Sequence, residues 1–155
     1  MKVRRRGGRV TVRLQGVEAA TLGNLLDQLA LLVEADADHE DPVIRRLYPS
    51  AYPDDADAER EFRGLTLDSL RVERRERVEA CQADLAGGRE LELDADSGRR
   101  WIQVLNDLRL ALGTELGVTE EDEPALDPTD PERDRRLVYY WLTGLQDELV
   151  RALMG

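Results

Sequence analysis

Cysteine and histidine are almost missing from this chain. The single cysteine, Cys81, excludes an internal disulfide and a cysteine-rich zinc site, and it fits a reducing compartment. The single histidine, His39, lies in the acidic stretch 34–41, where a hard-cation site or a pH-sensitive loop can be considered. The glycine and the bidentate glutamate of a calcium-binding loop are absent at the required offsets, so a solvated acidic loop is favoured.

Long hydrophobic runs are also lacking. No stretch approaches the length of a membrane span, and the basic N-terminus is not followed by a signal-peptide core, so we expect a cytoplasmic protein. The 155 residues are 41% hydrophobic and 35% charged, which is typical of one soluble domain over residues 1–155. Lysine is nearly absent too, because Lys2 stands against 21 arginines, a bias typical of a GC-rich genome.

The signatures of common enzyme classes do not occur. No serine lies in a nucleophile-elbow motif, and no glycine-rich loop has the spacing of a phosphate cradle. With 33 acidic residues, neighbouring carboxylates are expected by abundance alone and indicate no acid–base pair. We therefore predict a protein that is not an enzyme, with no catalytic residues, cofactor or metal. Cys81 falls on an apolar stripe, which favours a small buried hydrophobe, with a redox thiol as the alternative.

Charge is distributed very unevenly. The first 14 residues carry six basic and no acidic side chains, whereas the remainder holds all 33 acidic residues. The net charge of the whole chain is −11. Gly7-Gly8 lies in an alternating sequence and predicts a β-hairpin over residues 2–14. Its arginines could grip a phosphate backbone or an acidic protein surface. Outward residues of half-buried strands that balance an acidic body are favoured, because six charges at one tip give only weak, salt-sensitive binding. These candidate residues are Arg4, Arg5, Arg6 and Arg9.

Apolar periodicity predicts a mainly helical protein. A break near Gly64 is expected inside the second helical region, where the apolar phase changes and Arg74 intrudes on the stripe. The alternating segment 90–93 reads as a strand that pairs with the hairpin, and Pro131 is placed in the first turn of the last helix. The predicted class is α+β, with four to five helices and a small antiparallel sheet. The predicted helical regions are 17–35, 57–86, 95–116 and 131–153.

The stretch WIQVLNDLRLALGTELG, residues 101–117, is an amphipathic helix with polar residues inside it. Arg109 projects at the edge of the apolar arc beside Asn106, so the two could form a polar clamp between helices. The alternative is a partner-binding edge that exposes Asn106 and Asp107. Gly113 costs about 1 kcal/mol against alanine in a helix interior, which indicates close approach of another backbone.

This helix resembles the signature helix of the AosR-like family, an actinobacterial family of small acidic proteins long described as a domain of unknown function. The resemblance rests on Trp101, Leu105, the Asn106-Asp107 pair, Arg109-Leu110 and Leu112-Gly113, a WxxxLNDxRLxLG pattern. The basic N-terminal strands, the LYPSAY region, the LELD strand and the aromatic last helix extend it over nearly the whole chain.

The resemblance implies regulation rather than catalysis. Members of the family are described as redox-responsive stress regulators that act with a sigma factor in transcription, through a pair of cysteines that forms a disulfide. Here a redox response would need an intermolecular disulfide or a sulfenic acid at Cys81. We expect a regulatory or adaptor protein that binds a protein partner such as a sigma factor. Its contact surface would include the basic hairpin and the edge at Asn106 and Asp107. DNA binding through the hairpin is the alternative, and a homodimer through Tyr139, Tyr140 or the last helix stays open.

Overall fold

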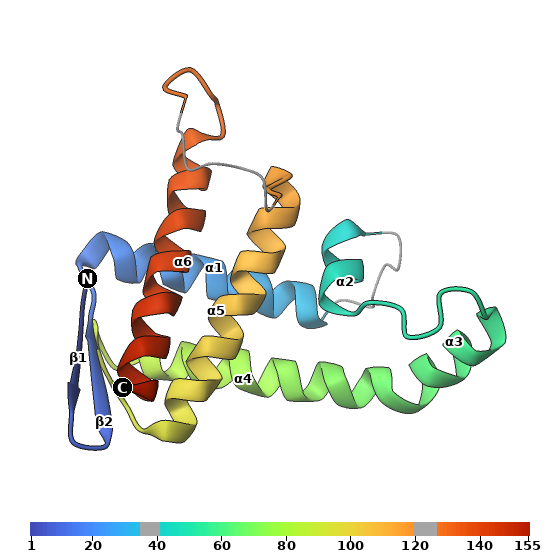
Figure 1. Cartoon of the computed structure of the whole chain (residues 1–155), viewed down its shortest axis with the longest axis horizontal. Coiled ribbons are helices and arrows are strands. Elements are labelled where there is room, and N and C mark those ends of the chain that lie inside the picture. Colours follow the sequence, from blue (N-terminus) through green and yellow to red (C-terminus); the bar gives the residue numbers. More distant parts are fainter. Residues whose placement is uncertain (35–40, 120–126) are drawn as a thin grey trace.

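The computed structural model describes residues 1–34, 41–119 and 127–155, and it confirms the mainly helical α+β class. Strands β1, β2 and β3 form an antiparallel sheet in that order at one end of the molecule (Figure 1). The elements are β1 Lys2–Arg6, β2 Arg9–Arg13, α1 Gly16–Glu34, α2 Pro42–Leu47, α3 Ala56–Phe62, the π-helical turn η1 Arg63–Leu67, α4 Asp68–Ala86, β3 Glu90–Leu93, α5 Ala95–Leu116 and α6 Arg133–Met154.

The sheet buries one face because its apolar residues alternate in register. Val10 lies opposite Leu93 and Val12 opposite Leu91, and all four side chains are buried. On the other face Thr11 and Arg13 lie opposite Glu92 and Glu90. The strand at 90–93 thus pairs with the hairpin through β2.

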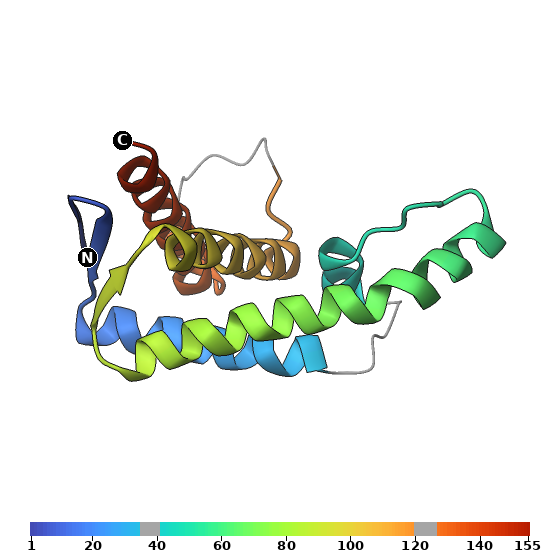
Figure 2. The ribbon, with the colours of Figure 1, turned by 90° about the horizontal axis from the view of Figure 1, so that it is seen from below.

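The helices form two layers. α1 and α4 run antiparallel and side by side (Figure 2), and α5 and α6 lie together across them (Figure 1). Leu22 and Leu26 of α1 and Leu105 of α5 are fully buried between the layers, and Trp101 is the largest fully buried side chain. The hydrophobic core therefore sits where α1, α4, α5 and α6 meet, with the sheet covering its end.

The predicted break near Gly64 does not occur, because the helix continues through this residue. α3, η1 and α4 follow one another without interruption, and the π turn takes up the change of apolar phase by inserting an extra residue. The Thr66 hydroxyl donates to the Phe62 carbonyl within this turn, at 2.6 Å. Residues 56–70, here called the arm, extend away from the two helical layers (Figure 1). For that reason Leu70, which lies at the start of α4, is 42% exposed.

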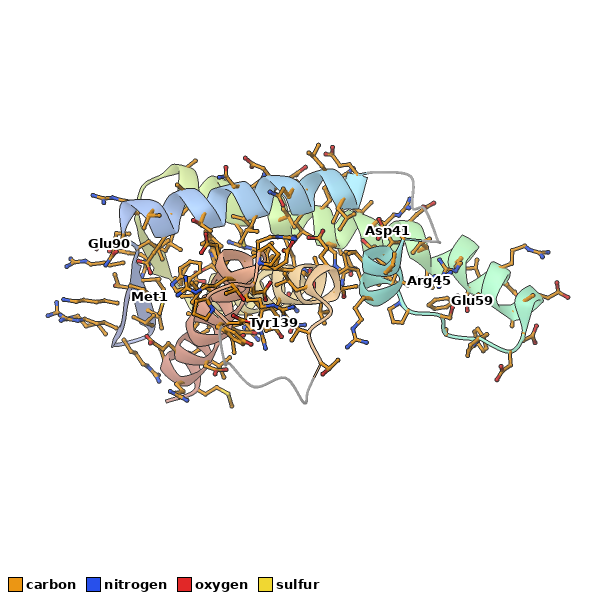
Figure 3. All side chains as sticks on the ribbon, turned by 90° about the horizontal axis from the view of Figure 1, so that it is seen from above. Met1, Asp41, Arg45, Glu59, Glu90 and Tyr139 are labelled. Atoms are coloured by element: carbon orange, nitrogen blue, oxygen red, sulfur yellow. The ribbon has the colours of Figure 1, made fainter. Side chains whose placement is uncertain are left out.

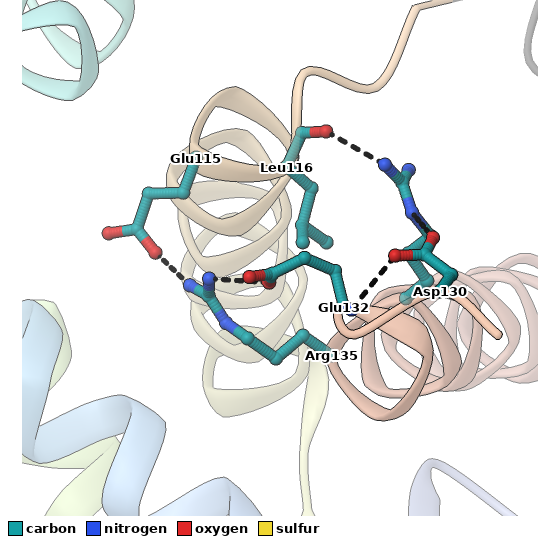
Figure 4. Close-up of polar contacts among 6 residues, drawn as sticks. Glu115, Leu116, Asp130, Glu132 and Arg135 are labelled. Carbon is teal, nitrogen blue, oxygen red and sulfur yellow. Dashed lines mark hydrogen bonds and ion pairs between the residues drawn. The ribbon is translucent and has the colours of Figure 1, made fainter.

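The last helix begins later than Pro131. The Asp130 carboxylate accepts from the Glu132 N–H at 2.9 Å, and the Arg133 N–H donates to the Asp130 carbonyl at 3.1 Å, so a turn precedes α6. Figure 4 shows that Arg135 pairs with both Glu115 and Glu132 at this junction. These contacts join the end of α5 to the start of α6. The acidic loop around His39 lies outside the described residues.

Candidate functional site

Helix α5 carries most of the residues that the sequence singled out, and both of its ends are well defined. Asp94 accepts from the Ser97 N–H at 2.8 Å while the Ser97 hydroxyl accepts from the Asp94 N–H, a reciprocal capping box. The hydrogen bond from the Ser97 backbone lowers the pKa of Asp94. Gly117 ends the helix in the left-handed conformation, with φ of 66°.

Asp107 is the buried acidic residue of α5. Its side chain accepts from Arg74 Nε at 3.0 Å and from Arg74 Nη2 at 3.3 Å, and the residue is 5% exposed. Burial raises the pKa of the Asp107 carboxyl, and the charge of Arg74 opposes that rise. The expectation that Asp107 forms an exposed edge is therefore wrong, because its carboxylate faces α4.

Arg74 connects three elements through its guanidinium. Nε and Nη2 contact Asp107, whereas Nη1 donates to the carbonyl of Leu47, at 3.0 Å. Leu47 is the last residue of α2. The guanidinium carbon also lies 4.6 Å from the centroid of the Tyr48 ring. In the sequence Arg74 occupies a position within an apolar stripe. A charged residue at such a position indicates a buried partner of opposite charge, which is Asp107.

Arg109 faces α6 instead. Its Nε donates to the Thr143 hydroxyl at 3.0 Å, and Nη1 donates to the Gln146 side-chain oxygen. Gln146 in turn donates to the Ile102 carbonyl on α5 at 3.3 Å. Arg109 thus joins the two helices through Thr143 and Gln146, whereas Asn106 is exposed and takes no part in this set of contacts.

Gly113 accommodates an aromatic ring rather than another backbone. A Cβ at this position would lie 3.0 Å from Cε2 of Tyr139, which is closer than such contacts normally come. Tyr139 is labelled in Figure 3, on α6 facing α5. The expectation of close backbone approach is corrected, because the missing side chain makes room for Tyr139.

Trp101 and Cys81 belong to the core. The indole N–H of Trp101 donates to the Asp84 carboxylate at 2.9 Å, and Arg100 contacts the same oxygen at 3.4 Å. Cys81 is fully buried on α4, and burial raises the pKa of its thiol to about 12. At neutral pH the thiolate, which is the reactive form, is therefore strongly disfavoured.

The basic hairpin lies on the surface at the opposite end from the arm. Arg4, Arg5, Arg6 and Arg9 are all exposed. Of these, Arg9 lies 3.9 Å from Glu92, and Arg5 Nε donates to the Gly7 carbonyl at 3.2 Å. Figure 3 shows long side chains extending outward from the sheet near Glu90.

Two kinds of feature are absent from the described ranges, residues 1–34, 41–119 and 127–155: a cluster of metal ligands and a membrane span. No group of three or more histidine, cysteine or acidic side chains there could hold a metal ion. None of the helices in those ranges has both the length and the apolar character needed to cross a membrane.

The fold and these contacts define a small, mainly helical α+β protein in which polar side chains join helix to helix. The chain belongs to the family described as "Domain of unknown function (DUF2017)", which matches residues 1–153. This confirms the family indicated by the α5 pattern. No solved structure matches the chain significantly.

Proteins from three mycobacteria are similar in sequence to this chain. The oxidative stress regulators AosR of Mycobacterium tuberculosis and Mycobacterium bovis are each 36% identical over 132 residues, 74% of this chain. That match covers 59% of each regulator, so the chain spans less than two thirds of their length. A Mycobacterium leprae relative is 36% identical over 151 residues, 84% of this chain and 68% of that protein.

Proposed function

We propose that this chain is a non-enzymatic regulatory protein that acts by binding a protein partner in the transcription machinery, such as a sigma factor. The observation that carries the proposal is the 36% identity to proteins named oxidative stress regulators. The exposed apolar side chains of the arm, Leu65 at 74% and Leu70 at 42%, support protein binding, because a partner that covers them removes apolar surface from water. The proposed location is the cytoplasm.

The experiment is purification of the tagged chain from its native host under reducing and oxidising conditions, with bound proteins identified by mass spectrometry. We expect a sigma factor or RNA polymerase to be enriched over an unrelated acidic protein carrying the same tag. The absence of any enriched transcription protein under both conditions contradicts the proposal.

Cys81 is proposed as a structural residue rather than an oxidant sensor. Its complete burial and the raised pKa of its thiol both oppose reaction with oxidants. We expect Cys81→Ser to keep the partner, with the same recovery under reducing and oxidising conditions. Loss of the partner in this variant alone, with folding intact, would establish the redox alternative.

DNA binding through the basic hairpin is the second candidate. The exposed Arg4, Arg5 and Arg6 favour it, since guanidinium groups that are free to reach phosphates supply salt-dependent affinity. The test is retention on random duplex DNA across a salt series, with a variant that replaces these three arginines by glutamine as the control. No retention at low ionic strength eliminates this candidate, and retention lost in the variant supports it.

A further inference from the structure

Strand β1 is an edge strand of the sheet, and one of its sides has no neighbouring strand. The strand order β1-β2-β3 leaves this side open, at one end of the molecule (Figure 1). An edge strand presents a row of backbone N–H and C=O groups with which another strand can pair. The open side of β1, here called the outer edge, can therefore accept an additional strand.

The hydrogen bonds of β2 determine which backbone groups belong to the outer edge. The N–H of Leu14, directly after β2, donates to the carbonyl of Arg89, directly before β3, at 2.8 Å. Even-numbered residues of β2 therefore face β3, and odd-numbered residues face β1. In that register the N–H and C=O groups of Val3 and Arg5 point away from β2. Apart from the pairing of β1 with β2, no backbone hydrogen bond to Val3 or Arg5 occurs in the described ranges.

The side chains along this edge are basic on one face of the sheet and apolar on the other. Lys2, Arg4 and Arg6 project from the solvent face and are exposed. None of the three has an ion-pair partner in the part of the chain that the structure describes. Val3 projects to the opposite face, where it is half-buried against the core.

Strand β3 shows how this sheet binds an acidic strand. Glu90 and Glu92 of β3 alternate with two buried leucines, which face the core. On the solvent face Arg13 of β2 pairs with Glu90 at 2.5 Å, and Arg9 lies 3.9 Å from Glu92. β1 repeats this arrangement at residues 2–4, with basic side chains on the solvent face and an apolar one on the core face. A strand with the composition of β3 therefore complements the outer edge of β1.

A second copy of the chain complements this edge less well. Pairing β1 with β1 of another copy would place basic side chains opposite basic ones, which destabilises a sheet. The glutamates of β3 already contact arginines of β2 in their own molecule. Pairing β1 with β3 of the next copy would also continue from molecule to molecule without closing. An acidic segment of a different protein meets neither obstacle.

We infer that the outer edge of β1 is the docking site for an extended segment of the protein partner in which acidic and apolar residues alternate. The backbone of this segment pairs with Val3 and Arg5, as in other cases of strand addition. Its carboxylates contact Lys2, Arg4 and Arg6, and an apolar side chain packs beside Val3. The inference rests on the proposed function and names the chemistry and binding mode of the partner.

The probe is a fluorescent synthetic peptide in which glutamate alternates with leucine, as in β3. Its binding to the full chain is measured by fluorescence anisotropy, and amide hydrogen exchange is followed by NMR. We expect the N–H groups of Val3 and Arg5 to exchange more slowly when the peptide is bound, while that of Arg4, already paired with β2, changes little.

Two modified peptides separate charge from backbone pairing. One has glutamine in place of glutamate, and the other is N-methylated at every second residue, which removes its backbone donors on one edge. Each should bind at least about fivefold more weakly, through the loss of ion pairs in the first and of hydrogen bonds in the second.

Variants of the chain make the same separation. Arg5→Pro removes an outward N–H, which an edge strand tolerates, whereas Arg5→Gln removes only the charge. We expect Arg5→Pro to bind the peptide about fivefold more weakly than Arg5→Gln. Arg4→Gln with Arg6→Gln should also weaken binding about fivefold. Arg60→Gln with Arg99→Gln removes two exposed charges elsewhere and should bind nearly as the unmodified chain does.

Thermal unfolding of every variant confirms that the fold is intact, and the N-methylated peptide tests backbone pairing if Arg5→Pro does not fold. Three results would overturn the inference: equal binding of the glutamate and glutamine peptides, unchanged exchange at Val3 and Arg5, or equal binding by folded Arg5→Pro and Arg5→Gln. Duplex DNA that displaces the peptide and binds both Arg5 variants equally would also overturn it and assign the edge to nucleic acid. Self-association of the chain that Arg5→Pro abolishes would overturn it in favour of a second copy.

Purification from the host separates the inference from the proposed function. We expect the tagged Arg5→Pro chain to recover less of the transcription protein than the tagged Arg5→Gln chain does. Equal recovery by the two folded variants overturns the inference and leaves the proposed function standing. Recovery of no transcription protein, by the unmodified chain or either variant, contradicts both.

Discussion

Asp107 and Arg109 lie two residues apart on α5 and face different neighbours. At 100° per residue their side chains are about 200° apart, so Asp107 meets Arg74 of α4 while Arg109 meets Thr143 and Gln146 of α6. A short polar interruption of one helix thus joins α5 to two others. Two residues of the stretch that carried the resemblance, Asp107 and Arg109, thus make helix-to-helix contacts in this structure.

Asp107→Asn should destabilise the protein by about 3 kcal/mol, because it leaves the guanidinium of Arg74 buried without its counter-charge. The control is Asn106→Ala at the neighbouring exposed position, which should stay within about 0.5 kcal/mol of the unmodified chain. Both are measured by urea unfolding. The double variant Arg74→Met with Asp107→Leu should recover most of the loss, and an unchanged Asp107→Asn would show that the pair is dispensable.

Two glycines in neighbouring helices provide a matched comparison. An added Cβ at Gly144 meets no atom within 4 Å, so Gly144→Ala should stabilise the protein by about 0.5–1 kcal/mol through helix propensity. At Gly113 the same atom lies 3.0 Å from Tyr139, and Gly113→Ala should instead cost about 1 kcal/mol. Chemical denaturation of both variants measures the difference, and equal stabilisation would mean that Tyr139 moves aside freely.

At the scale of elements, the π turn η1 decides which face of the arm is apolar. It connects α3 to α4 with no break and places Leu67 one turn beyond Phe62, and both side chains line an apolar groove that Leu47 of α2 closes. The Tyr52 N–H also donates to Glu59 of α3, at 2.8 Å, which holds the preceding loop against the arm. That hydrogen bond lowers the pKa of Glu59.

Deletion of Thr66 should convert the π turn to a regular α-helical turn and keep α3 in phase with α4, because Leu67 then follows Phe62 by four residues and still lies one turn beyond it. Phe62 and Glu59 should therefore stay beside Tyr52, and amide hydrogen exchange at Tyr52 should stay as slow as in the unmodified chain. Thr66→Ala keeps the residue count and serves as the control with unchanged exchange. Accelerated exchange at Tyr52 in the deletion variant alone would show that the arm needs the extra residue.

For the whole molecule, the hairpin at the start of the chain pairs with β3, and the two helical layers meet over Cys81 and Trp101. Access of solvent or reagents to Cys81 therefore requires opening of the packed layers. Ionisation of the Cys81 thiol is therefore coupled to global unfolding of the protein.

The stability that Cys81 contributes should depend on alkaline pH. The folded thiol has a pKa of about 12 against an ordinary value of 9.0, so its contribution is complete below pH 9 and falls as pH rises toward 12. The difference in unfolding free energy between the unmodified chain and Cys81→Ala should shrink by about 1.4 kcal/mol per pH unit above 9. Urea unfolding at several pH values measures it, and a constant difference would show that the thiol ionises freely in the folded state.

The sequence by itself determined the helices of the body, the three strands and the family. These follow from local periodicity, from turn-forming residues and from a residue pattern along one helix, none of which depends on tertiary contacts. The capping of α5 by Asp94 and its end at Gly117 were likewise predictable, because caps depend on residues a few positions apart.

Only the tertiary structure decided which neighbours the polar residues meet. Asp107 could be read as exposed because its partner Arg74 lies 33 residues away, and Gly113 could be read as a backbone contact because Tyr139 comes from another helix. The phase change at Gly64 was visible, but whether it breaks or bulges the helix depends on packing. The apolar groove lined by Leu47, Phe62 and Leu67 arises from α2 and the arm together, so no local pattern could reveal it.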